Sequence, residues 1–177
     1  MSTVVGRQAW QDLIGQLVVQ KQRLRELGDF ESDTRPNPGA TEAQLIAAEQ
    51  RLGRALDPQY RELLSVANGW EDFNLGWSLL GTEDIGIGAR WEDGLMASRI
   101  WFEDACLGDE IGAPNDASVY QLVVANENDF SGTVFVFVGE SNTLPTGAAV
   151  PLEPEETYPD LYSYFVDELK GITAWEG

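Results

Sequence analysis

Histidine is absent from the 177-residue sequence, and cysteine occurs only once, at Cys106. The lack of imidazole excludes histidine general bases, serine–histidine and cysteine–histidine catalytic arrangements, and zinc sites that use histidine. A lone cysteine cannot form a disulfide within the chain, which favours a reducing compartment. Because apolar and acidic residues flank it, we expect Cys106 to be a buried structural residue rather than a nucleophile.

Basic residues are also scarce: eleven Lys and Arg stand against thirty Asp and Glu, which gives a net charge of −19. Such a charge repels nucleic-acid phosphates and anionic lipid headgroups, so we expect neither direct nucleic-acid binding nor membrane-surface binding. No run approaches the ~18 apolar residues of a membrane span, and no secretory signal is visible. A hydrophobic content of 43% supports a folded core, and we expect a cytoplasmic protein organised as one domain over residues 1–177.

Two segments at the N-terminus precede the part of the chain with the clearest helix signals. Apolar residues recur at helical spacing from Trp10 to Leu27, which predicts an N-terminal helix within residues 1–28, ended by Gly28. Residues 29–39 contain two prolines and predict a connector, because proline cannot continue a helix.

A pair of helices follows, each with a recognisable start. Thr41 and Gln44 form a capping-box pattern, in which each side chain accepts a hydrogen bond from the other residue's backbone N–H. Asp57 followed by Pro58 predicts the start of the next helix, with an aspartate N-cap and a proline in the first turn. We expect the Asn-Gly pair at 68–69 to end that helix, since both residues tolerate left-handed backbone.

After residue 69 the apolar pattern changes to alternation and short apolar runs, which are typical of strands. The run 133–138 is apolar on both faces and predicts a central strand. The remaining expected elements are strands at 77–79, 120–125 and 149–152, a short helix at 97–106 and a final helix from Tyr158 onward. This order predicts an α+β fold: a mostly antiparallel, or mixed, central sheet of about five to six strands with helices packed on one side.

The helix pair also carries a resemblance to a known family. The residues concerned are Ala40-Thr41-Glu42-Ala43-Gln44-Leu45, Glu49, Leu52-Gly53, Leu56, Tyr60-Arg61, Leu64 and Asn68-Gly69. This pattern resembles the N-terminal signature of the SUKH superfamily, whose Smi/Knr-type members include many bacterial immunity proteins. The similarity extends over residues 40–170, although Asp57 separates the Leu-Pro pair that the family usually carries. The resemblance implies a SUKH-like α+β fold and a binding role in neutralising a toxin, often a nuclease.

Acidic residues are concentrated between residues 71 and 116, where eleven Asp and Glu accompany only two Arg. Aromatic residues, which are enriched in protein interfaces, are interleaved with them. The candidate partner-binding residues are Glu71, Asp72, Glu92, Asp93, Trp101, Glu103, Asp104, Asp109, Glu110 and Asp116. A nuclease holds phosphates in a cationic cleft, and a carboxylate-rich surface can occupy such a cleft and steer its own association. The same composition also suits a solvated surface that keeps the protein soluble, so composition alone leaves both interpretations open.

Catalytic and cofactor motifs are weak by comparison. Adjacent carboxylates on a helix or strand point apart, so the acidic doublets do not predict a catalytic dyad. Phe130 interrupts the oxygen-ligand pattern that calcium needs in the loop 126–132, and the segment 86–88 lacks the third glycine of a dinucleotide site. We therefore expect no catalytic residue, no cofactor and no metal.

The sequence supports three functional hypotheses of different classes. The first is a non-catalytic immunity protein that binds and neutralises a cognate basic toxin domain, with a nuclease favoured by charge. The second is a regulatory or scaffold module of the Smi/Knr type that binds an endogenous partner. The third is an enzyme that uses carboxylates, with or without a divalent metal. Whether the protein is a monomer or a dimer stays open at this point.

Overall fold

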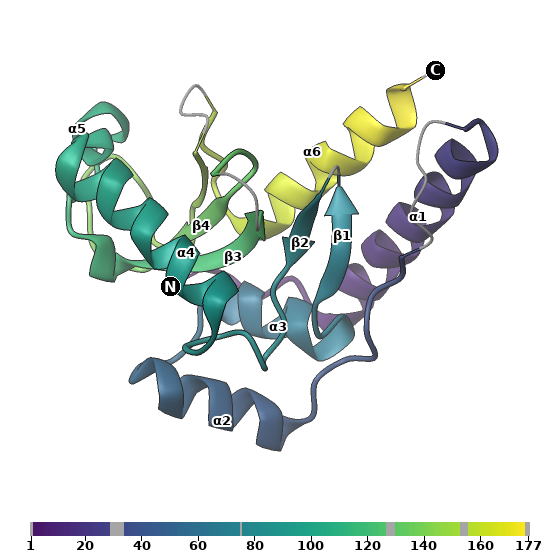
Figure 1. The fold of residues 1–177 in the computed structure, drawn as a ribbon, viewed down its shortest axis with the longest axis horizontal. Helices are drawn as coiled ribbons and strands as arrows, with labels where there is room; N and C mark the ends of the chain where they lie inside the picture. Colours follow the sequence, from purple (N-terminus) through teal and green to yellow (C-terminus); the bar gives the residue numbers. More distant parts are fainter. Residues whose placement is uncertain (1, 29–33, 75, 127–129, 153–155, 176–177) are drawn as a thin grey trace.

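A computed structural model describes residues 2–28, 34–74, 76–126, 130–152 and 156–175 of the chain (Figure 1). Helices dominate the first part, and the strands follow from residue 70 onward. The helices are α1 (Arg7–Glu26), α2 (Glu42–Leu52), α3 (Pro58–Val66), α4 (Ala89–Ser98), the π-helix η1 (Arg99–Asp104), α5 (Leu107–Ile111), the 3-10 helix η2 (Ala117–Val119) and α6 (Leu161–Ala174). The strands are β1 (Trp70–Asn74), β2 (Trp77–Leu79), β3 (Tyr120–Asn126), β4 (Val134–Phe137) and β5 (Ala149–Pro151).

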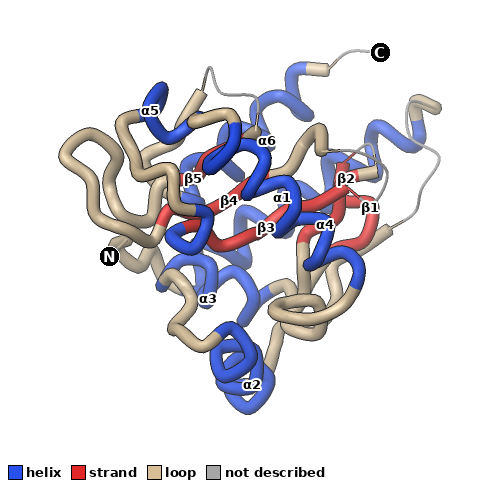
Figure 2. Tube along the Cα trace, turned by 60° about the vertical axis from the view of Figure 1, so that its left-hand side comes forward, coloured by secondary structure: helices blue, strands red, loops and turns tan. Residues whose placement is uncertain are grey.

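The five strands form one sheet in the order β1-β2-β3-β4-β5, with every neighbouring pair antiparallel. Figure 2 shows them side by side across the middle of the molecule. All four residues of β4 are buried, which confirms that this apolar run lies inside the sheet. The α+β class and the antiparallel sheet expected from the sequence are thus confirmed, and the strand order follows the chain without a crossover.

Helices cover both faces of the sheet rather than one. On one face, Phe102 of η1 stacks on Tyr120 of β3 with ring centroids 3.6 Å apart. Tyr120 lies directly opposite Phe137 of β4, so both side chains share that face. The next residue, Gln121, points to the other face, where its side chain bonds the backbone N–H of Asp57 at the start of α3. The expectation that helices pack on one side is therefore wrong: α3 and its neighbours α1 and α6 lie on one face, and α4 and η1 cover the opposite face.

Helices α2 and α3 begin where the sequence predicts, and α6 begins three residues after the expected Tyr158. Thr41 accepts a hydrogen bond from the backbone N–H of Gln44, and the Gln44 side chain bonds back to Thr41, which completes the capping box. Asp57 caps α3 by accepting from the backbone N–H groups of Gln59 and Tyr60. Asp160 caps α6 through Ser163.

The end of α3 differs from the expectation. The helix stops at Val66, and its C-cap Ala67 is extended and pairs with Pro38 of the connector. Gly69 does adopt a positive φ of 87°, but it leads the chain into β1 rather than closing the helix. A side chain at Gly69 would place its Cβ 2.9 Å from the backbone nitrogen of Gly81, so the close approach of these two segments requires glycine here.

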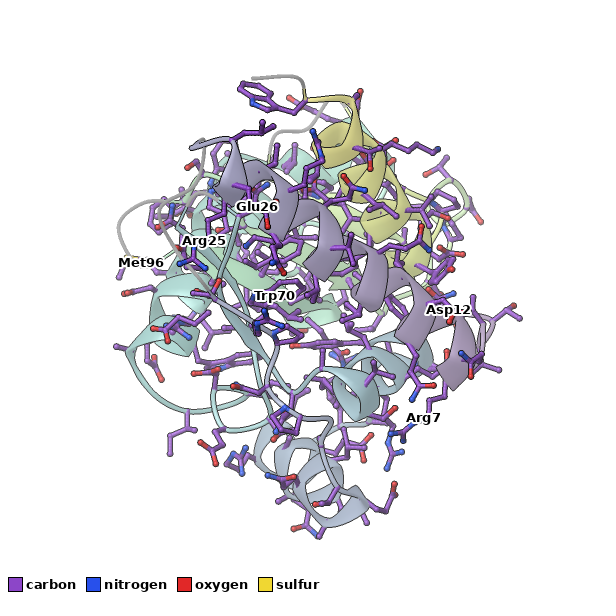
Figure 3. All side chains as sticks on the ribbon, turned by 90° about the vertical axis from the view of Figure 1, so that its right-hand side faces the viewer. Arg7, Asp12, Arg25, Glu26, Trp70 and Met96 are labelled. Atoms are coloured by element: carbon purple, nitrogen blue, oxygen red, sulfur yellow. The ribbon has the colours of Figure 1, made fainter. Side chains whose placement is uncertain are left out.

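Aromatic side chains form much of the core on the face covered by α1 and α6. Trp10 of α1 contacts Phe165 of α6 edge-on at 5.9 Å, and Phe165 contacts Phe73 of β1 at 5.6 Å. Trp70, which is labelled near the middle of Figure 3, then meets Phe73 at 5.3 Å. Edge-to-face pairs of this kind add about 0.5–1.5 kcal/mol each beyond the area they bury.

The segment between β2 and β3 departs most from the sequence-based expectation. The short helix expected at 97–106 is part of a longer unit that begins at Ala89 and passes into a π-helix at Arg99. Cys106 is exposed, with a positive φ of 55°, so the expectation of a buried cysteine is wrong. Strand β1 was not expected either, and part of the loop 126–132 lies outside the described residues.

Candidate partner-binding surface

The unit formed by α4 and η1 is amphipathic, and its buried side fixes how it lies on the sheet. The buried residues are Trp91, Gly94, Ala97, Ser98 and Phe102. Gly94 lets the helix approach β3 closely, because a Cβ at this position would meet the side chain of Leu122. The stacking of Phe102 on Tyr120 anchors the other end of the unit. The opposite side of α4 and η1 must therefore face solvent.

That outward side combines carboxylates with two apolar residues. Met96 is 55% exposed and Ile100 is 38% exposed. The other exposed residues of α4 and η1 between positions 92 and 104 are Glu92, Asp93, Arg99, Glu103 and Asp104. In Figure 3 Met96 lies at one edge of the molecule, well away from Arg7 and Asp12 of α1.

The π-helix gives this unit an uncommon backbone. The N–H of Ala105 donates to the carbonyl of Ile100 at 2.8 Å, five residues back, instead of to a carbonyl four residues back. Single π-turns inside helices occur often at functional sites. Here the wider turn includes the buried Phe102 and, after it, the exposed Glu103 and Asp104.

Further acidic residues come from α5 and η2, which continue the same surface. Asp109 and Glu110 are exposed in the first turn of α5. Glu103 accepts a hydrogen bond from the backbone N–H of Ala117 at 3.3 Å, which ties η1 to η2. Asp116 caps η2, and its hydrogen bonds from Ser118 lower the pKa of its carboxyl. We call the exposed residues between 92 and 118 the α4–η2 surface.

Seven of the ten sequence-predicted residues share this surface as carboxylates: Glu92, Asp93, Glu103, Asp104, Asp109, Glu110 and Asp116. Arg99 is the only basic residue between positions 92 and 118. The structure thus gathers most of the predicted acids on one part of the molecule, at the left of Figure 1. A field of one sign on a surface of this size attracts partners of the opposite sign.

Glu71 and Asp72 of β1 have different surroundings. The Asp72 carboxylate accepts a hydrogen bond from the backbone N–H of Gly76 at 2.8 Å, and its φ of 48° marks an irregular strand. Glu71 is exposed and lies 3.8 Å from Arg90 of α4. Asp72 is therefore engaged in shaping the β1–β2 turn, whereas Glu71 reaches the first turn of α4.

Trp101, the predicted aromatic residue of the surface, is half-buried, and its indole N–H is buried without a hydrogen-bond partner among the described residues. The apolar residues that protrude are instead Met96 and Ile100. Their spacing of four residues was a usable signal, but it required α4 to be assigned as a helix first. The start of α4 at Ala89 is difficult to predict, because it follows glycines at positions 86 and 88 and has no side-chain cap.

The acids of the α4–η2 surface are not arranged as a metal centre. Within the described ranges, no group of three or more Asp, Glu or Cys side chains has the geometry to hold a metal ion. The helices in those ranges also include none with the length and hydropathy required to cross a bilayer. The surface presents dispersed negative charge around two apolar side chains.

Comparison with known proteins places this arrangement in a family. A model of the SMI1/KNR4 family (SUKH-1) matches residues 39–165, well over half of the chain. The chain belongs to this family. The match runs from just before α2 into α6 and includes the entire α4–η2 surface, whereas α1 precedes it. None of the curated proteins matches the chain. Membership of SUKH-1 confirms the resemblance found in the sequence and suggests an immunity-type or Smi/Knr-like role in protein interaction.

Proposed function

We propose that the protein is a non-catalytic immunity protein that binds and neutralises a cognate bacterial toxin domain. The observation that carries this proposal is the α4–η2 surface, where seven carboxylates accompany a single arginine. Family membership supports a binding role, and the surface supports a basic partner. A nuclease is the favoured class of toxin because its active site must hold phosphates with cationic side chains.

The mechanism is occlusion of the toxin's active site. Carboxylates of the α4–η2 surface take the place of nucleic-acid phosphates in the basic cleft and exclude the substrate. Opposite charge on the two proteins also steers their encounter, with association rates up to about 10⁸–10⁹ M⁻¹s⁻¹ at low salt. The immunity protein acts in the cytoplasm of the producing cell, where it meets the toxin before the toxin reaches nucleic acid.

Capture of the toxin and titration of its activity test the proposal. The tagged chain is incubated with host lysate, washed at low and high salt, and the retained proteins are identified. A purified toxin domain encoded beside this gene is then titrated with the chain in a nuclease assay. We expect inhibition that is complete near one chain per toxin domain and association that slows as salt increases. Undiminished toxin activity at excess chain would contradict an immunity function.

A regulatory or scaffold module is the second candidate, because SUKH-1 membership also suggests Smi/Knr-like interaction functions. Such a module binds an endogenous protein, and its gene need not lie beside a toxin gene. Retention of the same housekeeping protein in repeated captures, together with an absence of toxin inhibition, would favour this candidate.

A further inference from the structure

The exposed face of α4 and η1 has an apolar centre between two pairs of carboxylates. Met96 and Ile100 are four residues apart, so their side chains are neighbours on the helix surface. Glu92 and Asp93 precede them by about one turn, and the carboxylates at 103–104 follow them by about one turn. An apolar centre surrounded by a polar rim is the usual anatomy of a specific protein interface.

This face is held rigidly before any partner arrives. Phe102 contacts both Tyr120 and Phe135 of the sheet, and Gly94 brings α4 against Leu122. A preformed face loses little conformational freedom on binding, so more of its contact energy appears as affinity. Exposed apolar side chains on such a face are therefore well placed to act as anchors.

We propose that this face is the docking surface for a cationic partner that covers Met96 and Ile100 with an apolar slot and sets basic side chains against both carboxylate pairs. The inference rests on the proposed function in that the toxin domain is the expected partner. It goes further by naming the two anchor residues and the chemistry of the surface that receives them. The helix-in-groove mode of recognition uses anchors at this spacing.

Charge decides against a second copy of the chain as the occupant. A twofold contact through this face would place Glu92 and Asp93 of one copy opposite the carboxylates at 103–104 of the other. Like charges in such positions repel at both ends of the contact. A partner with basic groups at both ends turns the same two contacts into attractions.

The two kinds of residue have separable effects. The carboxylates act over a distance and accelerate association, so their contribution weakens as salt screens charge. Met96 and Ile100 act only in contact, so their removal shortens the lifetime of the complex at any salt concentration.

Two synthetic peptides test the inference whatever the identity of the natural partner. One is an amphipathic helix built only of Leu and Lys, and the other contains Lys alone. We expect the double variant Met96→Gln/Ile100→Gln to bind the Leu/Lys peptide about tenfold more weakly than the unmodified chain, as anchor residues do. Binding of the Lys peptide should change by less than about twofold, because that peptide offers charge without an apolar face.

The matched control is Val19→Gln, which replaces an apolar residue that is 63% exposed on α1. We expect this variant to bind both peptides as the unmodified chain does. Glutamine suits helix interiors, so the variants should retain their melting temperatures. The inference would be overturned if Val19→Gln and the double variant lost the same affinity for the Leu/Lys peptide, or if neither variant lost any.

Binding and inhibition of the toxin domain encoded beside this gene, measured with the same variants, distinguish this inference from the proposed function. A toxin domain that loses affinity only for the double variant supports both. A toxin domain that is inhibited equally by the unmodified chain and the double variant would overturn the docking surface and leave the immunity function intact. A toxin domain that binds neither protein would overturn the immunity function, while the Leu/Lys peptide still decides the docking surface.

Discussion

The two ends of the molecule use charge in different ways. Helix α1 carries four basic and two acidic residues, whereas residues 92–118 carry seven acidic residues and one arginine. In Figure 1 these regions lie on opposite sides of the sheet. The bases near α1 bond internal carbonyls: Arg23 donates to Ile172 at 2.9 Å, and Lys21 donates to Asp72 at 2.9 Å. The scarce bases thus hold the fold together, while many of the abundant acids face outward.

The same use of arginine recurs elsewhere in the chain. Arg51 of α2 donates to the carbonyls of Thr82 and Ile85, and so joins α2 to the turn before α4. Arg54 donates to the carbonyl of Ser118 beside η2. Arg51 thus bonds only backbone carbonyls, whereas the charge of Arg54 also reaches Asp116 of the α4–η2 surface and helps to lower the pKa of that carboxyl.

The largest effect should come from removing the contact that seats α4 and η1 on the sheet. Phe102→Ala deletes a fully buried ring that stacks on Tyr120. We expect the free energy of unfolding to fall by about 3–5 kcal/mol, as for other buried aromatic residues. Denaturant unfolding measures this change in free energy, and Trp175→Ala is the control, because Trp175 is 57% exposed. A loss below about 1 kcal/mol would show that the α4–η1 unit is not packed as described.

The buried lysine near α1 makes stability depend on pH. Burial lowers the pKa of Lys21 to about 8, an effect that nearby Asp72 opposes. Between pH 8 and 10 the unfolded chain binds more protons at this group than the folded chain does, so stability should rise with pH. The contribution of Lys21 is roughly 2 kcal/mol over the whole range from pH 8 to pH 10, and ionisation of unfolded tyrosines, whose pKa is near 10, opposes it in the upper part of that range.

The variant Lys21→Met isolates this contribution. Methionine is apolar and of similar length, so it suits the site beside the Trp70 ring, over which the Lys21 ammonium lies at 5.0 Å, but it cannot titrate. We expect the stability difference between the unmodified chain and this variant to change in favour of the unmodified chain from pH 8 to pH 10. A difference that is constant over that range would mean that Lys21 is not desolvated.

A pair of glycine substitutions compares the packing of the two regions directly. At Gly94 in α4 a Cβ would meet Leu122, whereas at Gly15 in α1 it would meet nothing within 4 Å. Gly94→Ala should destabilise the protein by about 1–3 kcal/mol through overpacking. Gly15→Ala should stabilise it by about 1 kcal/mol, because alanine favours the helix and the site is open. Melting temperatures that move in the same direction for both variants would contradict the packing of α4.

Divalent metals should have the smallest effect. The described residues contain no group of side chains arranged for a metal ion, and the enzyme hypothesis includes the option of one. We expect Ca²⁺, Mg²⁺ and Mn²⁺ to leave the melting temperature within about 1 °C, since a ligand stabilises only a fold that binds it. A saturable increase in melting temperature with one of these ions would support the enzyme hypothesis.

The accuracy of the sequence-based expectations also differs between the two regions. Local signals predict the N-terminal half well, because capping side chains such as Thr41 and Asp57 act on backbone within three residues. In the segment that contains the candidate surface, α4, η1 and α5 begin without a side-chain cap, and only the short η2 has one, at Asp116. Helix α4 begins at a glycine N-cap without a side-chain cap, and it continues into a π-helix that no simple period describes.

The candidate site shows the same division. The sequence alone identifies the acidic residues, because their number and positions along the chain do not depend on the fold. Their position on one surface, and the exposure of Met96 and Ile100 among them, depends on which side of α4 the sheet covers. Strand β1 is also difficult to predict from the sequence, because its backbone is irregular: Asp72, in the middle of the strand, has a positive φ.

Association kinetics with two matched charge reversals test the central claim most directly. Glu103→Lys/Asp104→Lys and Asp12→Lys/Glu26→Lys change the net charge equally, but only the first pair lies on the α4–η2 surface. We expect the first variant to associate with the toxin domain about tenfold more slowly at low salt, and the second to associate at nearly the unmodified rate. Equal association rates for the two variants would contradict a partner-binding role for the α4–η2 surface.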